Sequence, residues 1–223
     1  MRRPAAVTLV EYTKAQERAN CLTHAAGAVC AAACFAAALL KTIPTGSVRR
    51  IAAAAVYCTA FFAVYTISAV YHCLPHGDAK RTARRLDHMA IPLLLAGTAT
   101  PCALISLHRV SPATGTAVFH IAWSCAAFGV VSKLFLFENK LFKTLCMVVY
   151  FTGGAVMMLL AVPLLGRIDR TAFLLLTAGC LLYAGGAALC RAGMKRPWFH
   201  TAFHVLVLAG SLVQFYVVYK YIL

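Results

Sequence analysis

The sequence predicts an all-α membrane protein, a bundle of seven transmembrane helices with little chain outside the bilayer. Its 223 residues are 62% apolar and only 12% charged, whereas a soluble domain carries about 25% charged residues. The mean hydropathy is +0.79, and the apolar residues fall into seven runs of about the 20 residues that one helix needs to cross a bilayer. A soluble domain and a disordered chain are excluded, since neither carries so much apolar side chain.

The first run, 19–40, follows a basic start that would also suit a signal peptide. The run begins only after 18 residues, however, and has Asn20, Thr23 and His24 at its entrance, so we expect a permanent helix. Short breaks carrying charge, Pro or Gly separate it from the later runs, which are 50–73, 87–107, 114–137, 142–165, 171–190 and 198–220.

This division leaves no room for a separate soluble domain. We expect a cytoplasmic N-terminal segment, residues 1–18, and a single transmembrane domain, residues 19–223. The pairs Gly153–Gly154 and Gly185–Gly186 stand in the middle of their runs, where small residues let helices approach closely. Pro197 suits the first position of the last helix.

The net charge of +15 comes from 21 Lys and Arg against 6 Asp and Glu. These cations lie in short loops, which favours contact with anionic lipid headgroups and argues against a nucleic-acid partner. Fourteen of them fall on the side of the N-terminus and seven on the other. This bias predicts a cytoplasmic N-terminus and an external C-terminus.

The ten cysteines show no metal-type spacing such as CxxC. We expect reduced thiols within the membrane rather than a disulfide framework. Most of them lie well inside the apolar runs, among them Cys30, Cys34, Cys58, Cys102, Cys125, Cys146 and Cys180.

Four runs that are distant in sequence bring polar groups to one predicted end of the bundle. Ionisable groups are costly in a membrane, so such a gathering indicates a functional site. The groups are Asn20 and His24, Ser68 and His72, Asp87 and His88, and His200 and His204.

The spacing of the histidines predicts a metal site. His200 and His204 stand at i,i+4, one above the other on a helix face, and His72 would complete the three-imidazole set of catalytic zinc sites. An isolated pair of histidines would be explained equally well by packing. Because imidazole binds metal in its neutral form, the site should weaken at acid pH.

Asp87 would serve either as a fourth ligand or as a base that hydrogen-bonds a metal-bound water. Ser68 would steady an oxyanion or hydrogen-bond Asp87. Asn20, His24 and His88 are expected to support the site from outside rather than to bind the ion.

Segments 17–24, 68–72, 84–88 and 197–204 together resemble the hemolysin III family, the bacterial branch of the progestin and adiponectin receptor superfamily. The resemblance covers nearly the whole chain. It implies a multi-pass protein of the bacterial plasma membrane with a cytoplasmic N-terminus and a zinc ion near the cytoplasmic face. By position, the zinc ligands would be His72, His200 and His204, with Asp87 holding the zinc-bound water and Ser68 as a supporting group.

Eukaryotic relatives in the superfamily resemble ceramidase-type hydrolases, so the resemblance implies a zinc-dependent hydrolase of a lipid-like amide. Membrane lipids and a lipid-like substrate are the expected partners. Two alternatives are a receptor or sensor with a structural zinc and, from the family name, a membrane-lysing or pore-forming protein. A transporter is less favoured, because the ionisable groups gather at one face and form no chain across the bilayer.

Overall fold

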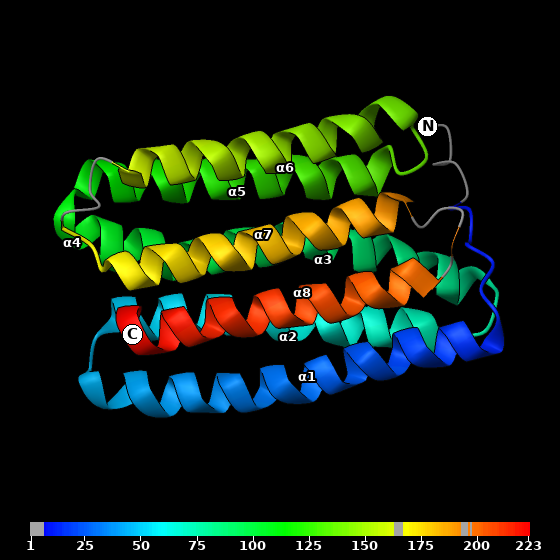
Figure 1. Cartoon of the computed structure of the whole chain (residues 1–223), viewed down its shortest axis with the longest axis horizontal. Helices are drawn as coiled ribbons and strands as arrows, with labels where there is room; N and C mark the ends of the chain where they lie inside the picture. Colours follow the sequence, from blue (N-terminus) through cyan, green and yellow to red (C-terminus); the bar gives the residue numbers. More distant parts are fainter. Residues whose placement is uncertain (1–6, 163–166, 193–195, 197) are drawn as a thin grey trace.

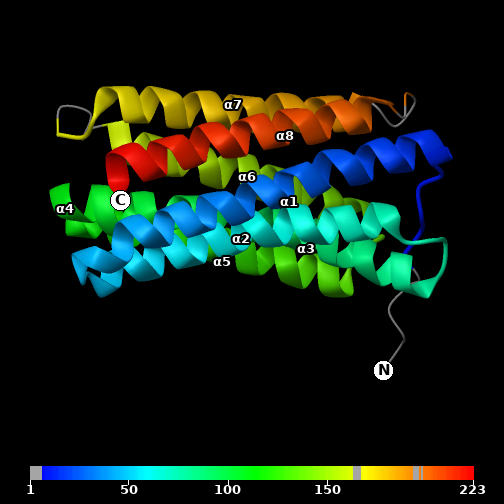
Figure 2. The ribbon, with the colours of Figure 1, turned by 90° about the horizontal axis from the view of Figure 1, so that it is seen from below.

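The computed structural model is a bundle of long helices that lie side by side along one axis (Figures 1 and 2). It describes residues 7–162, 167–192, 196 and 198–223. Within these residues there is no β-strand. Seven helices are long and apolar enough to cross a membrane, which confirms the predicted fold class.

The chain runs back and forth along the bundle axis. The main helices are α1 (Lys14–Thr42), α2 (Val48–Cys73), α3 (Asp78–Pro101), α5 (Pro112–Phe135), α6 (Lys140–Ala161), α7 (Arg170–Ala192) and α8 (Trp198–Val217). The third span continues beyond α3 through a π-helical turn, η2 (Cys102–Leu107), and the short α4 (His108–Val110). The last span ends in a second π-helical turn, η5 (Val218–Ile222), and α1 ends in the 3₁₀ turn η1 (Ile43–Thr45).

The predicted boundaries are wrong by several residues at two places. Helix α1 begins at Lys14, because the Thr13 side chain and Gln16 form a capping box that starts the helix. Helix α3 begins at Asp78, nine residues before the predicted start at Asp87. Hydropathy misses this first part because charged residues dominate it, although they are good helix formers. Pro197 and part of the fifth run lie outside the described residues.

Helices α1, α2, α3 and α8 pack together in one part of the bundle. Helix α1 packs on α2 and α8, and α2 also packs on α3. The buried face of α2 carries Tyr57, Phe61 and Tyr65, which form much of the apolar core. With 3.6 residues per turn, Ser68 and His72 continue the same face, so both are buried. The core of α2 therefore determines which way these two polar side chains point.

One glycine of each predicted pair lies at a helix contact. A Cβ added to Gly153 would lie 2.7 Å from Sγ of Cys125, and one at Gly186 would lie 3.2 Å from the Phe203 ring. Gly154 and Gly185 have nothing within 4 Å of such a Cβ. Gly153 and Gly186 therefore let neighbouring helices approach closely, as predicted for small residues, whereas Gly154 and Gly185 do not take part in such a contact.

The expectation that all cysteines are reduced is wrong for one pair. Cys21 and Cys73 form a disulfide between α1 and α2, with Cα atoms 5.8 Å apart. The pairing escapes sequence reasoning because 52 residues separate the two cysteines, and only the antiparallel packing of the helices brings them together. The other eight cysteines are free thiols.

Candidate metal site

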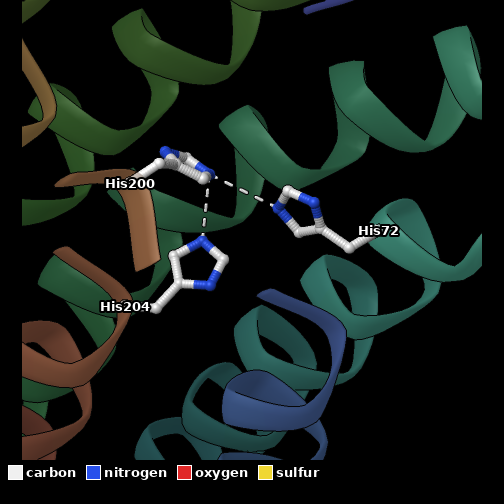
Figure 3. Close-up of side chains that lie close together, drawn as sticks. All are labelled: His72, His200 and His204. Atoms are coloured by element: carbon white, nitrogen blue, oxygen red, sulfur yellow. Dashed lines mark hydrogen bonds between the residues drawn. The ribbon is translucent and has the colours of Figure 1, made fainter. Parts of the chain in front are cut away.

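Three histidines from two distant segments of the chain meet at one end of the bundle. Figure 3 shows His72 of α2 facing His200 and His204 of α8. The Nε2 atom of His200 lies 3.4 Å from Nε2 of His72 and 3.1 Å from Nε2 of His204. One nitrogen from each ring falls within 4.8 Å of the others, so the three form a group that could hold a metal ion.

The opposite nitrogens of these rings each meet a partner outside the cluster. Nδ1 of His72 lies 2.7 Å from the Glu17 carboxylate, and Nδ1 of His204 lies 3.3 Å from the Thr23 hydroxyl. The Thr23 hydroxyl donates its own proton to backbone carbonyls, so it accepts from His204. Nδ1 of His200 lies 3.8 Å from Sγ of Cys190.

These outer contacts direct the lone pairs of the cluster inward. A carboxylate can only accept, so Nδ1 of His72 carries a proton, and in the neutral ring that binds metal Nε2 then carries a lone pair. The same holds for His204 through Thr23. Two inward lone pairs beside His200 repel one another unless a cation or a proton lies between them. An outer hydrogen-bond partner that orients the ring is the usual arrangement for histidine metal ligands.

The spacing of the nitrogens fits zinc. Nitrogens bound at about 2.0–2.1 Å in a tetrahedron lie roughly 3.3 Å from one another. The two measured Nε2 separations, 3.1 and 3.4 Å, are close to this value. Imidazole is also a ligand that zinc accepts readily. Three ligands would leave one tetrahedral position open.

Asp87 lies beside the cluster but does not belong to the group of three ligands. Its carboxylate is 3.5 Å from Nδ1 of the neighbouring His88 and close to the Ser68 hydroxyl. It is also near enough to His200 to interact electrostatically with that ring. The two predicted roles of Asp87, fourth ligand and base, both stay predictions.

Asn20 and His24 of α1 both contact α8 beside the cluster. Asn20 is fully buried, and its Oδ1 accepts from the Thr201 hydroxyl at 2.6 Å. The His24 ring stacks on His204 with centroids 3.6 Å apart. Both ring nitrogens of His24 are buried without a hydrogen-bond partner among the described residues. Such a group is costly unless a water or a bound molecule satisfies it.

His88 turns away from the cluster. Its Nδ1 lies 3.0 Å from the carbonyl oxygen of Arg84, and its ring meets Phe137 edge-on with centroids 5.0 Å apart. Its contact with the site is the neighbouring carboxylate of Asp87.

Sequence reasoning missed the Glu17–Lys80 pair. Glu17 bridges His72 and the buried Lys80, whose Nζ lies 2.9 Å from Oε1 of Glu17. Lys80 also donates to the carbonyl oxygens of Tyr71 and Leu74 at the end of α2. The signal that could have found Glu17 is its spacing, since positions 17, 20 and 24 share one helix face.

Sequence reasoning also missed Tyr12, which covers the cluster from the N-terminal side. Its ring stacks on His200 with centroids 5.4 Å apart and lies 5.9 Å from His72. Burial raises the pKa of the Tyr12 phenol well above its ordinary value. Tyr12 is therefore a half-buried ring packed against two of the three histidines.

We call residues 7–13 the N-terminal strap, and it is fixed to two other segments. The Thr8 backbone N–H and hydroxyl both donate to Oε1 of Glu138 at 2.8 Å, in the turn between α5 and α6. Arg81 donates to the Val7 carbonyl at 2.8 Å, and Arg84 donates to the Thr8 carbonyl.

Glu138 is held as a carboxylate in this contact. Burial opposes its ionisation, but hydrogen bonds from Lys143 and Thr8 outweigh the burial and lower the pKa of Glu138 to about 2. Lys143 contributes an ion pair with an N–O distance of 2.7 Å.

Comparison with known proteins agrees with the family that the sequence motifs predict. The family model described as haemolysin-III related matches residues 12–215. The chain is 32% identical to hemolysin-3 of Bacillus cereus, over 96% of this chain and 95% of that protein. It is 30% identical to the hemolysin-3 homolog of Bacillus subtilis (strain 168), over 94% of this chain and 96% of that protein. The chain is therefore a multi-pass cell-membrane protein that belongs to the hemolysin III family.

Proposed function

We propose that the protein is a zinc-dependent membrane hydrolase that cleaves a lipid-like amide. The observation that carries the proposal is the convergence of three imidazole nitrogens, spaced for a tetrahedral metal, beside a carboxylate that is not itself a ligand. A histidine triad with one open position is typical of catalytic rather than structural zinc sites.

His72, His200 and His204 would hold the ion. Zinc bound there would supply Lewis-acid polarisation of a carbonyl group and activation of water. Asp87 would accept the proton of the attacking water and pass it to the leaving amine. Ser68, close to Asp87, orients that carboxylate or donates to the carbonyl oxygen of the substrate.

The test is lipid turnover by purified, zinc-loaded protein across a panel of N-acyl lipids. We expect release of fatty acid, its loss in His204→Ala, and its loss with retained zinc in Asp87→Asn. His120→Ala is the matched control, because His120 is exposed on α5, away from the cluster. If the zinc-loaded wild-type protein releases no fatty acid from any lipid of the panel, the proposed hydrolase activity is wrong.

A second candidate is a receptor or sensor with a structural zinc, and the N-terminal strap favours it. Tyr12 stacks on a candidate ligand, and Glu138, Arg81 and Arg84 all hold the strap in place. An ion covered by the strap would be shielded from substrate, which favours a structural role for the metal over a catalytic one. This reading expects removal of zinc to lower the unfolding temperature while no substrate is turned over under any condition.

Membrane lysis is a third candidate, because both curated relatives carry the name hemolysin-3. The seven apolar spans look like resident helices rather than segments that insert into foreign membranes. Dye release from liposomes distinguishes the readings. Release that persists in a variant lacking all three histidines would favour lysis over hydrolysis.

A further inference from the structure

A basic cavity lies at the end of the bundle opposite the histidine cluster. Its volume is about 280 Å³, far more than the roughly 10–15 Å³ that a single water molecule needs. It opens between the end of α1, the start of α2 and the ends of the third and seventh spans, at the end where the C-terminus lies (Figure 1). The lining residues are Lys41, Arg50, Ile105, Ser106, Arg109, Lys220, Tyr221, Ile222 and Leu223.

Four of these side chains are cations, and none of the lining side chains that the structure describes is acidic. Lys41 and Arg50 are half-buried, whereas Arg109 and Lys220 are exposed. In the described part of the chain none of the four forms an ion pair with a carboxylate side chain. The side chains that line the cavity therefore carry a net positive charge.

The hydrogen bonds of these cations use only part of their donor capacity. Arg50 donates to the backbone oxygen of Leu223 at 2.8 Å, and Lys41 donates to the carbonyl of Tyr219. Lys220 donates to the Tyr216 hydroxyl at 3.1 Å. A lysine has three donors and an arginine has five, so most N–H groups around the cavity remain available to a ligand.

The backbone around the cavity is unusual in two places. Ile105 and Ser106 belong to the π-helical turn η2, and the residues from Lys220 to Ile222 belong to the π-helical turn η5. The two turns contact each other. π-helical turns are rare within α-helices and occur frequently at functional sites. Two of them on one cavity are a second observation, independent of the charge, that points to binding.

We propose that this cavity is a phosphate-binding site. Arginine and lysine together suit a phosphate, because the guanidinium binds two of its oxygens in a fork and the ammonium adds a point charge. The Ser106 hydroxyl offers a further donor. The phosphate comes either from an anionic phospholipid headgroup or from inorganic phosphate, since a cavity at the end of a transmembrane bundle is accessible at the level of the headgroups. The inference is independent of the metal site.

The experiment measures the unfolding temperature of the full-length protein with each source of phosphate. Inorganic phosphate is titrated in a nonionic detergent at constant ionic strength, and phosphatidylglycerol is compared with phosphatidylcholine in nanodiscs. A ligand that binds only the folded state raises the unfolding temperature in proportion to its affinity. We expect a rise with inorganic phosphate, with phosphatidylglycerol, or with both.

The variant is the double substitution Arg109→Gln and Lys220→Gln, whose exposed side chains can be changed without disturbing the core. We expect it to weaken the apparent affinity about tenfold, as loss of charge-assisted hydrogen bonds should. Arg49→Gln is the matched control, since Arg49 is exposed at the same end but does not line the cavity.

A response to inorganic phosphate alone supports a soluble ligand, and a response only to phosphatidylglycerol supports a lipid headgroup. The proposal is overturned if neither ligand stabilises the protein or if the double variant responds like the wild type. It is also overturned if Arg49→Gln loses as much phosphate affinity as the double variant. Binding would then depend on the total positive charge at this end of the bundle and not on the cavity.

Discussion

Glu17 is the residue on which the orientation of His72 depends. It accepts from Nδ1 of His72 and pairs with the buried Lys80, so its two oxygens connect a candidate ligand to the end of α2. A carboxylate in this position fixes the tautomer of the imidazole and makes it a better ligand. Glu17 acts through His72 and is therefore a positioning residue.

Glu17→Gln should weaken zinc binding by about 10–100-fold, the range seen when an outer partner of a histidine ligand is lost. Glutamine keeps the volume, so Lys80 retains a polar neighbour. The measurement is competition with a zinc chelator of known affinity. Glu11→Gln is the control, because Glu11 is exposed and its ion pair among the described residues is with His76, outside the cluster. Equal zinc affinity in the wild type and Glu17→Gln would contradict the positioning role.

Single residues were predictable from the sequence where spacing on one helix decides the geometry. The i,i+4 pair of His200 and His204 is of this kind, and Ser68 with His72 is another. Tyr12 was not predictable, because its contact with His200 depends on the path of a segment without regular structure. Sequence left two roles open for Asp87, fourth ligand or base, and only a structure with the bound ion would decide between them.

At the scale of elements, Gly27 lets α1 pack closely against the Tyr65 ring of α2. A Cβ at Gly27 would collide with the ring of Tyr65. That ring packs edge-on against His24 and hydrogen-bonds Ser211 at 2.8 Å through its hydroxyl. The close approach of α1 to α2 therefore also holds the groups behind the histidine cluster.

Gly27→Ala should destabilise the folded protein by about 1–3 kcal/mol, since overpacking a tight contact forces side chains out of place. Gly154→Ala is the matched control, because nothing lies within 4 Å of a Cβ at that position. Thermal unfolding in detergent compares the two. A Gly27→Ala variant as stable as Gly154→Ala would show that the contact between α1 and Tyr65 is looser than described.

The N-terminal strap should respond to acid through Glu138. The pKa of Glu138 is lowered to about 2 in the fold, below the value of about 4.3 for a free glutamate. A lowered pKa in the folded state means that the contact stabilises the strap fully above about pH 4.3 and loses this contribution as the pH falls toward 2. We expect faster hydrogen exchange in the strap, relative to an unstructured reference peptide, across that interval.

Glu138→Gln should loosen the strap already at neutral pH and remove its dependence on pH in this interval. Glu11→Gln, in the strap itself, is the control. Equal hydrogen-exchange rates of the strap in the wild type and in Glu138→Gln would show that the hydrogen bonds from Thr8 to Glu138 do not hold the strap in place.

At the scale of the whole molecule, composition alone predicted a seven-helix membrane bundle, because the length of an apolar run is fixed by the thickness of the bilayer. It could not predict that α3 begins in a charged stretch at Asp78, since hydropathy does not register amphipathic helix at the membrane surface. It also could not predict the Cys21–Cys73 disulfide, which depends on the packing of two helices.

Orientation in the membrane is a prediction of the charge bias. Alkaline phosphatase fused to the C-terminus should be active, and the same enzyme fused after Asn139 should be inactive, because the first end is expected outside and the second inside. Fusions with the opposite activities would reverse the orientation and place the histidine cluster at the outer face.

The central claim is that His72, His200 and His204 bind one metal ion together. The direct measurement is elemental analysis of the purified wild type beside a variant with His200→Ala and His204→Ala, and beside His120→Ala. The account expects about one zinc per chain in the wild type and in His120→Ala, and almost none in the double variant. Equal zinc content in all three proteins, or no metal in the wild type, would contradict it.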